Sequence, residues 1–127
     1  MIIMRVLAII FLGGGLGSVL RYLVNRWTTA VISAAFPYGT FIVNIAGCFL
    51  IGFLVFYTER FGINSINWRL FLVTGFCGGF TTFSSFSFEN VQLMESQHIF
   101  MMLMYALGSI ILGFLAAYAG ILLARST

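Results

Sequence analysis

The chain has 127 residues, of which 61% are hydrophobic and only 7% are charged. A water-soluble domain usually carries about 25% charged residues, so too few charges are present here to cover a surface that faces water. The mean hydropathy of +1.10 agrees with burial in a lipid bilayer. The six Arg residues lie far apart along the sequence, which excludes the clustered basic surface that nucleic-acid binding requires.

The charged residues divide the chain into four apolar runs. A helix that crosses about 30 Å of hydrocarbon needs about 20 mostly apolar residues. The runs extend from about 4 to 22, from 37 to 58, from 69 to 89 and from 99 to 124. Short connections join them, so the sequence predicts one all-α domain, residues 1–127, with four transmembrane helices.

The first run contains Gly13, Gly17 and Arg21, which are four residues apart and therefore share one helix face. The two glycines are typical of a small-residue seam that packs against another helix. Arg21 either extends its side chain to the membrane surface or attracts anions to a vestibule. The pattern leaves both roles open for Arg21.

The second run carries an amide side chain deep in its apolar stretch. Thr40, Asn44 and Cys48 stand four residues apart on one helix face. A buried amide must find hydrogen-bond partners. Asn44 can meet this need by bonding to a neighbouring helix or by donating to a ligand that passes.

The third run contains the most informative segment, GFCGGFTTFSSFS at 75–87. Its glycine and hydroxyl residues disfavour a continuous helix and predict a break near the middle of the membrane. Such a break persists only where protein or a cavity satisfies the backbone, and its freed carbonyl groups can bind ions. Phe80, Phe83 and Phe86 recur every three residues here. A Phe stripe alone is typical of core packing, but beside a break the electropositive ring edges could contact an anion.

The fourth run carries Tyr105 and Ser109 on one helix face. Ser109 could bond back to its own helix, or it could continue a row of donors with Asn44 and Thr82. We expect no carboxylate at the centre of a span, because Glu59, Glu89 and Glu95 all fall at the ends of the runs. Hydroxyl and amide donors without charged traps suit a small anion that must enter and also leave. No nucleophile–base pair, zinc signature or phosphate loop is present, so the sequence does not predict an enzyme.

Three motifs together resemble those of the small bacterial fluoride channels, the Fluc/CrcB family. They are the G-x-x-x-R run at 17–21, the Gly-Thr-Phe-x-Val-Asn-x-x-Gly run at 39–47 and the run GFCGGFTTFS at 75–84. The resemblance implies a channel that exports fluoride passively across the bacterial inner membrane and relieves fluoride toxicity. It also implies an antiparallel, dual-topology homodimer of four-helix subunits, with two fluoride pores along the subunit interface.

The resemblance further implies roles for individual residues. Arg21 would lie in the vestibule, and the backbone carbonyls of Gly75 and Gly78 would hold a structural sodium ion at the break. The implied pore and polar-track residues are Phe80, Phe83, Asn44, Tyr105, Ser109, Thr40, Thr82 and Ser84.

Two other functions compete with this interpretation. A small dual-topology, proton-coupled multidrug exporter also has four short helices, but it would need a carboxylate inside the membrane, and the first run has none. A membrane anchor that transports nothing would need only packing seams between its helices. Such a function does not account for Asn44 in the second span or for the break in the third span.

The positions of the arginines indicate on which side of the membrane the termini lie. With four spans, both termini and the second connection share one side of the membrane, together with Arg5, Arg60, Arg69 and Arg125. Arg21 and Arg26 belong to the other side. Four against two favours a cytoplasmic location for the termini, whereas a chain of dual topology should show almost no bias.

Overall fold

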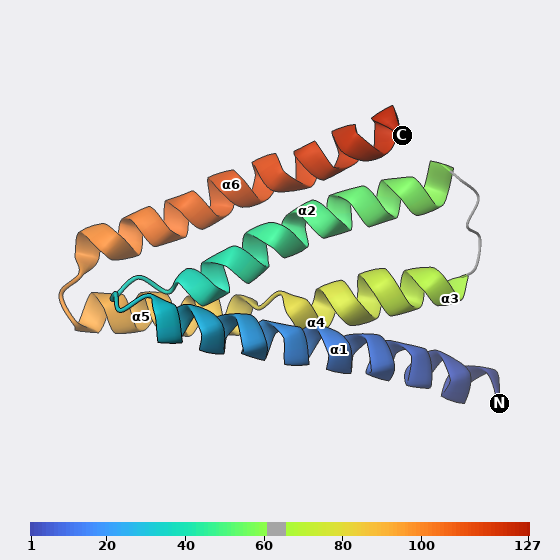
Figure 1. Cartoon of the computed structure of the whole chain (residues 1–127), viewed down its shortest axis with the longest axis horizontal. Helices are drawn as coiled ribbons and strands as arrows, with labels where there is room; N and C mark the ends of the chain where they lie inside the picture. Colours follow the sequence, from blue (N-terminus) through green and yellow to red (C-terminus); the bar gives the residue numbers. More distant parts are fainter. Residues whose placement is uncertain (61–65) are drawn as a thin grey trace.

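The computed structural model describes residues 1–60 and 66–127, and four long helical segments make up nearly all of this part (Figure 1). All four are long and apolar enough to cross a membrane. This confirms the predicted all-α membrane architecture. The elements are α1 (Ile2–Val31), α2 (Tyr38–Arg60), α3 (Ile66–Arg69), the π-helix η1 (Leu70–Cys77), α4 (Gly78–Phe80), α5 (Phe83–Glu95) and α6 (Ile99–Ser126).

The predicted runs locate the four helices, but two of the helices are longer than expected. The first helix continues to Val31 instead of ending near Tyr22. The third segment continues to Glu95 instead of ending at Glu89. Both differences have one cause. The prediction ended a span at a charged residue, whereas a helix can continue through an Arg or Glu whose side chain finds water or a protein partner.

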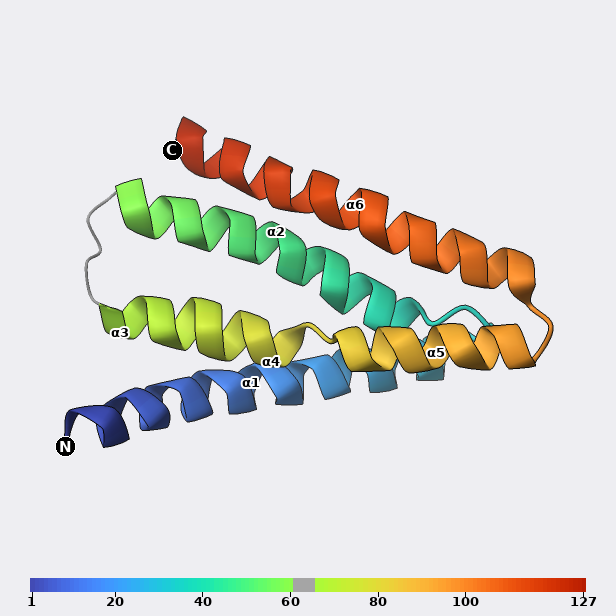
Figure 2. The ribbon, with the colours of Figure 1, turned by 180° about the vertical axis from the view of Figure 1, so that it is seen from behind.

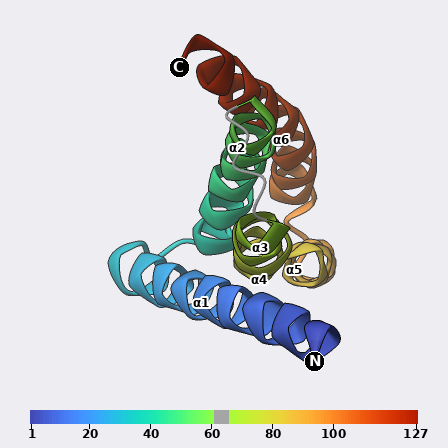
Figure 3. The same cartoon turned by 90° about the vertical axis from the view of Figure 1, so that its right-hand side faces the viewer.

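The third segment lies between α1 and the pair formed by α2 and α6. Seen end-on, α1 crosses one side of it, while α2 and α6 lie together on the other side (Figure 3). The most extensive contacts join α2 to α6, and α1 to η1 and α4. The third segment therefore occupies the centre of the subunit, where packing can support an interrupted helix.

Glycines allow α1 to approach the third segment at backbone distance. A Cβ atom on Gly13 would collide with the carbonyl oxygen of Phe71, and one on Gly17 would collide with that of Phe76. Gly79 approaches the backbone of Gly14 in the same way. The predicted small-residue seam is confirmed, and glycines on the third segment complete it from the opposite side.

The sequence analysis did not identify a second seam, which joins α2 to α6. A Cβ atom on Gly52 would meet the backbone of Ala117, and one on Gly120 would meet the backbone of Phe49. On the outer surfaces, large apolar side chains stay exposed, as for Phe100 at 77% and Phe114 at 77%. A surface of this kind matches contact with lipid.

The predicted break in the third span is present, at Thr81 and Thr82. Thr81 has φ −86° and ψ 156°, and Thr82 has φ −150° and ψ 119°, so both residues are extended. The strand-like gap between α4 and α5 is visible in Figure 2. The Thr82 hydroxyl accepts a hydrogen bond from the Ser85 N–H at 3.2 Å and thereby caps α5. Before the break, η1 forms π-helical turns, which are rare in proteins and frequent at functional sites.

Candidate ion pathway

Asn44 on α2 satisfies the interrupted backbone of the third span. Its Nδ2 donates to the Thr82 carbonyl oxygen at 3.0 Å, and the Thr82 N–H donates to Asn44 Oδ1 at 2.8 Å. An amide has two N–H donors, so one N–H of Asn44 remains available beyond this pair of bonds. The amide thus bonds to a neighbouring segment and keeps one donor for a second partner.

The same exchange releases a carbonyl group at Gly78. In a continuous helix the Thr82 N–H would donate to the Gly78 oxygen, but here it donates to Asn44 instead. Gly78 is exposed on the single chain, with open space where a Cβ would lie. The Gly75 carbonyl accepts the N–H of Gly78 at the start of α4. A carbonyl released from its helical partner on an open surface fits an oxygen-binding cation such as sodium.

A groove of about 610 Å³ runs along the break. Asn44, Thr82, Phe83, Phe86 and Ser109 all contribute to its wall, together with Gly78. Among the described residues, no charged side chain lines it. The groove therefore brings together these six residues, all of which the sequence analysis named. Amide, hydroxyl and aromatic groups stand in its wall beside aliphatic side chains and the thiols of Cys48 and Cys77.

Ser109 presents a hydroxyl that has no partner. Its Oγ is buried and makes no hydrogen bond within the described part of the chain. Other helical hydroxyls behave differently, since those of Thr28 and Thr58 bond back to carbonyls of their own helices. A buried, unpaired polar group costs free energy. Of the two roles considered for Ser109, back-bonding is absent, and the hydroxyl beside the groove is ready for an external partner.

The two predicted pore phenylalanines occupy different environments in the single chain. Phe83 is 79% exposed and lines the groove, with its ring centroid 5.8 Å from that of Phe86. Phe80 is only 5% exposed and stacks on Phe76 at 5.7 Å, outside the lining of the groove. The structure therefore places Phe83 at the groove and packs Phe80 behind it.

A carboxylate cluster continues the row of polar groups beyond Phe86. Glu89 accepts a hydrogen bond from the Thr40 hydroxyl at 2.6 Å and one from the Tyr105 hydroxyl at 2.7 Å. Glu89 lies inside the third span, more than one helical turn before its end at Glu95. Glu89 is thus not the last residue of its helix, as the predicted run had it, whereas the expectation that no carboxylate lies at the centre of a span stays a prediction. The absence of Gly and Pro between Phe83 and Glu95 was the signal that could have shown the helix continuing past Glu89.

Tyr105 connects this cluster to the groove. Its hydroxyl bonds to Glu89, and its ring lies 5.1 Å from the ring of Phe86. Ser109 follows one turn later on the same face of α6. A second cavity, of about 740 Å³, has Thr40 and Glu89 in its wall. A row of polar side chains therefore joins two cavities through the subunit.

Two further predicted residues are placed by the structure. The Ser84 hydroxyl lies 3.2 Å from that of Thr82 and so belongs to the break. Arg21 is half-buried on α1 and lines neither cavity of the single chain. Its assignment to a vestibule stays a prediction.

Comparison with known proteins agrees with this geometry. Residues 8–121 match the family described as "CrcB-like protein, Camphor Resistance (CrcB)". A protein of Flavobacterium psychrophilum named "Fluoride-specific ion channel FluC" is 46% identical over 122 residues, which cover 96% of this chain and 98% of the relative. Proteins of the same name are 49% identical in Phocaeicola vulgatus, over 93% of this chain and 97% of the relative, and 52% identical in Chlorobium luteolum, over 89% and 87%. This chain belongs to the CrcB-like family.

Proposed function

We propose that this chain forms a fluoride-selective channel that lets fluoride leave the cell passively and so relieves its toxicity. The observation that carries the proposal is the groove at the break, where Asn44 and Ser109, whose buried hydroxyl has no partner among the described residues, line a space without charged side chains. The relatives named fluoride-specific ion channels support it. They are channels, so we propose no enzymatic activity.

The groups in the groove suit a dehydrated anion. Fluoride must give up tightly bound water, and a hydrogen-bond donor without a protein partner can replace that water at no cost to the fold. Ser109 supplies such a donor, and Asn44 supplies its remaining N–H. The ring edge of Phe83 adds a weak electropositive contact. Weak, successive contacts let the ion leave again, as conduction requires.

Glu89 affects how tightly fluoride can bind to the polar side chains beside it. Its carboxylate already accepts the hydroxyls of Thr40 and Tyr105, so fluoride can bond to either hydroxyl only by displacing a carboxylate oxygen. The competition weakens fluoride binding at this point and favours release. We infer that Glu89 orients both hydroxyls and keeps fluoride from binding too tightly to leave the pathway.

We propose that two copies assemble antiparallel, in the inner membrane of a bacterium. In contact with lipid, the few amide and hydroxyl groups of the groove would stay unsatisfied, whereas a second copy would cover them. One end of the subunit carries Arg5, Arg60, Arg69 and Arg125 with Glu59, and the other carries Arg21 and Arg26 with Glu89 and Glu95. Antiparallel pairing places one end of each kind on each side of the membrane, so the excess of arginine does not collect on one side.

The structural sodium belongs to the same proposal. The released Gly78 carbonyl and the Gly75 carbonyl would hold it, and the equivalent groups of the second copy would complete the oxygen shell. The ion would tie the two interrupted helices together by electrostatic attraction to carbonyl oxygens.

The test is fluoride efflux from proteoliposomes, recorded with a fluoride electrode and compared with chloride under the same membrane potential. We expect fast fluoride efflux and no chloride efflux. Absence of fluoride efflux from folded, dimeric protein in sodium buffer would contradict the proposal. A proton-coupled exporter is not favoured, because α1 contains no carboxylate, and drug-dependent proton movement in the same vesicles would be needed to support one.

A further inference from the structure

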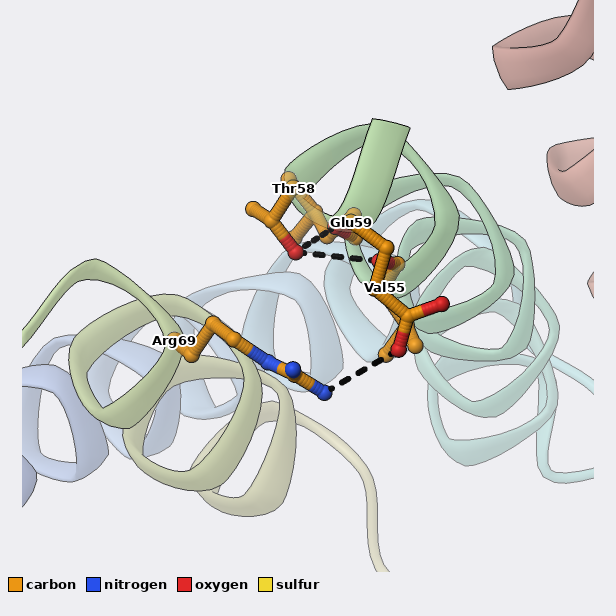
Figure 4. A network of polar contacts seen from close by, with 5 residues as sticks. Val55, Thr58, Glu59 and Arg69 are labelled. Atoms are coloured by element: carbon orange, nitrogen blue, oxygen red, sulfur yellow. Dashed lines mark hydrogen bonds and ion pairs between the residues drawn. The ribbon is translucent and has the colours of Figure 1, made fainter. Parts of the chain in front are cut away.

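A basic site lies at the end of the subunit where α2 and α6 finish. The spans end at Arg60 and Ser126, so these side chains lie at the level of the lipid headgroups. Among the described residues at this end, Glu59 is the only acidic side chain, and it pairs with Arg69 at 3.5 Å (Figure 4). The acidic charge of this end is therefore directed toward α3 and away from α6.

Arg60 covers the carboxyl end of α6. Its Nη1 donates to the carbonyl oxygens of Ala124 and Arg125. The last carbonyl groups of a helix carry partial negative charge, which would repel an anion. The guanidinium of Arg60 offsets this charge and makes the end of α6 compatible with a bound anion.

Arg125 adds a second guanidinium on the same face of α2. It lies 5.0 Å from the centre of the Phe56 ring, and within the described part of the chain its side chain is exposed and forms no hydrogen bond. Phe56 and Arg60 are four residues apart on α2 and share one face of that helix, and Arg60 donates to the Arg125 carbonyl, so both arginines lie at this end of the α2–α6 pair. A guanidinium that lies over an aromatic ring still has N–H groups for an acceptor.

The geometry points to a phosphate-binding site formed by Arg125 and Arg60, occupied by the headgroup of an anionic phospholipid. Two neighbouring guanidinium groups repel each other unless an anion lies between them. Phosphate accepts paired N–H donors from Arg, and lipid phosphates are the anions concentrated at this depth. The site is separate from the ion pathway and does not depend on the transported ion.

Native mass spectrometry of the purified full chain can test the site. Phosphatidylglycerol and phosphatidylcholine with the same acyl chains are titrated separately, and retained lipid is counted. One Arg near a membrane surface is worth about fivefold in affinity for an anionic lipid, so R125Q should weaken phosphatidylglycerol retention about fivefold. F56L, which keeps every charge but removes the aromatic support, should weaken it in the same direction. Retention of phosphatidylcholine should not change.

The matched control is R5Q, which removes an exposed Arg at the same end that lies over no aromatic ring of the described residues. Wild-type retention of phosphatidylglycerol in R125Q and F56L would overturn the site, and so would an equal loss in R5Q, because both results indicate diffuse charge attraction. Inorganic phosphate at the same concentration is a separate arm. If it displaces the lipid completely, free phosphate is the ligand and the lipid assignment is wrong.

Discussion

Asn44 and Thr82 exchange two hydrogen bonds across the interrupted third span, one from the Asn44 amide to the Thr82 carbonyl and one from the Thr82 N–H to the amide oxygen. The pair replaces both backbone bonds that a continuous helix would have supplied at Thr82. It also releases the Gly78 carbonyl and sets the wall of the groove. A single side chain on α2 thus maintains the break and contributes to the proposed pathway.

Replacing Asn44 with Ala should destabilise the subunit, because it leaves a buried N–H and a buried carbonyl of Thr82 without partners. Each such group costs about 1–3 kcal/mol. Thermal unfolding in detergent measures the change, and fluoride efflux should fall with it. N90A is the matched control, since the Asn90 amide bonds only to Phe86 in its own helix. Equal stability of N44A and wild type would contradict the role of the amide.

Replacing Ser109 with Ala should separate transport from stability. The buried Ser109 hydroxyl has no partner among the described residues, so its loss should not destabilise the subunit and should stabilise it by up to about 1–3 kcal/mol. Loss of one donor to the ion should lower fluoride flux about tenfold. The control is S126A, whose hydroxyl bonds back to Leu123 at the end of α6. Unchanged flux in S109A would remove this hydroxyl from the pathway.

Replacing Phe80 and Phe83 together with Ile should reduce fluoride flux sharply and leave the dimer intact. The single variants should differ. F83I acts at the exposed wall of the groove, whereas F80I also loses the stacking on Phe76 and should unfold at a lower temperature. F114I controls for loss of an exposed ring on the lipid face. Undiminished flux in the double variant would exclude the pair from the mechanism.

Replacing Glu89 with Gln should tighten fluoride binding and slow its release. The amide nitrogen of Gln cannot accept a hydrogen bond, so one of the hydroxyls of Thr40 and Tyr105 becomes available to fluoride. We expect flux to saturate at a lower fluoride concentration and to reach a lower maximum. E59Q, at an exposed ion pair with Arg69, is the control. An unchanged concentration dependence in E89Q would refute the competition.

Replacing Gly17 with Ala should destabilise the pairing of α1 with the third segment by about 1–3 kcal/mol, because the new methyl group meets the Phe76 backbone. Gly15 lies two residues earlier on α1 with no atom near its Cβ position. G15A should therefore be neutral or slightly stabilising, since Ala favours helix more than Gly. Thermal unfolding of the two variants checks the seam, and equal behaviour would argue against it.

Features that depend on local sequence were predictable. Apolar length located the four helices, and the combination of glycine and hydroxyl residues located the break to within the segment 75–87. The spacing of Gly13 and Gly17 alone predicted a small-residue packing seam, and the structure confirms it. In each case the responsible residues are neighbours in the chain, and the physical cause is the solvation of the backbone in lipid.

Other features depended on contacts between distant residues. Thr40 and Glu89 are 49 positions apart, yet their hydrogen bond keeps a carboxylate within a span, where residue spacing suggested an end. Whether Asn44 would bond to protein was likewise decided by Thr82, 38 positions away. The sequence by itself determined that this chain crosses the membrane four times and carries an interrupted third helix. Only the tertiary structure decided which donors are already occupied and which remain for an ion, because hydrogen-bond partners are chosen by packing between helices.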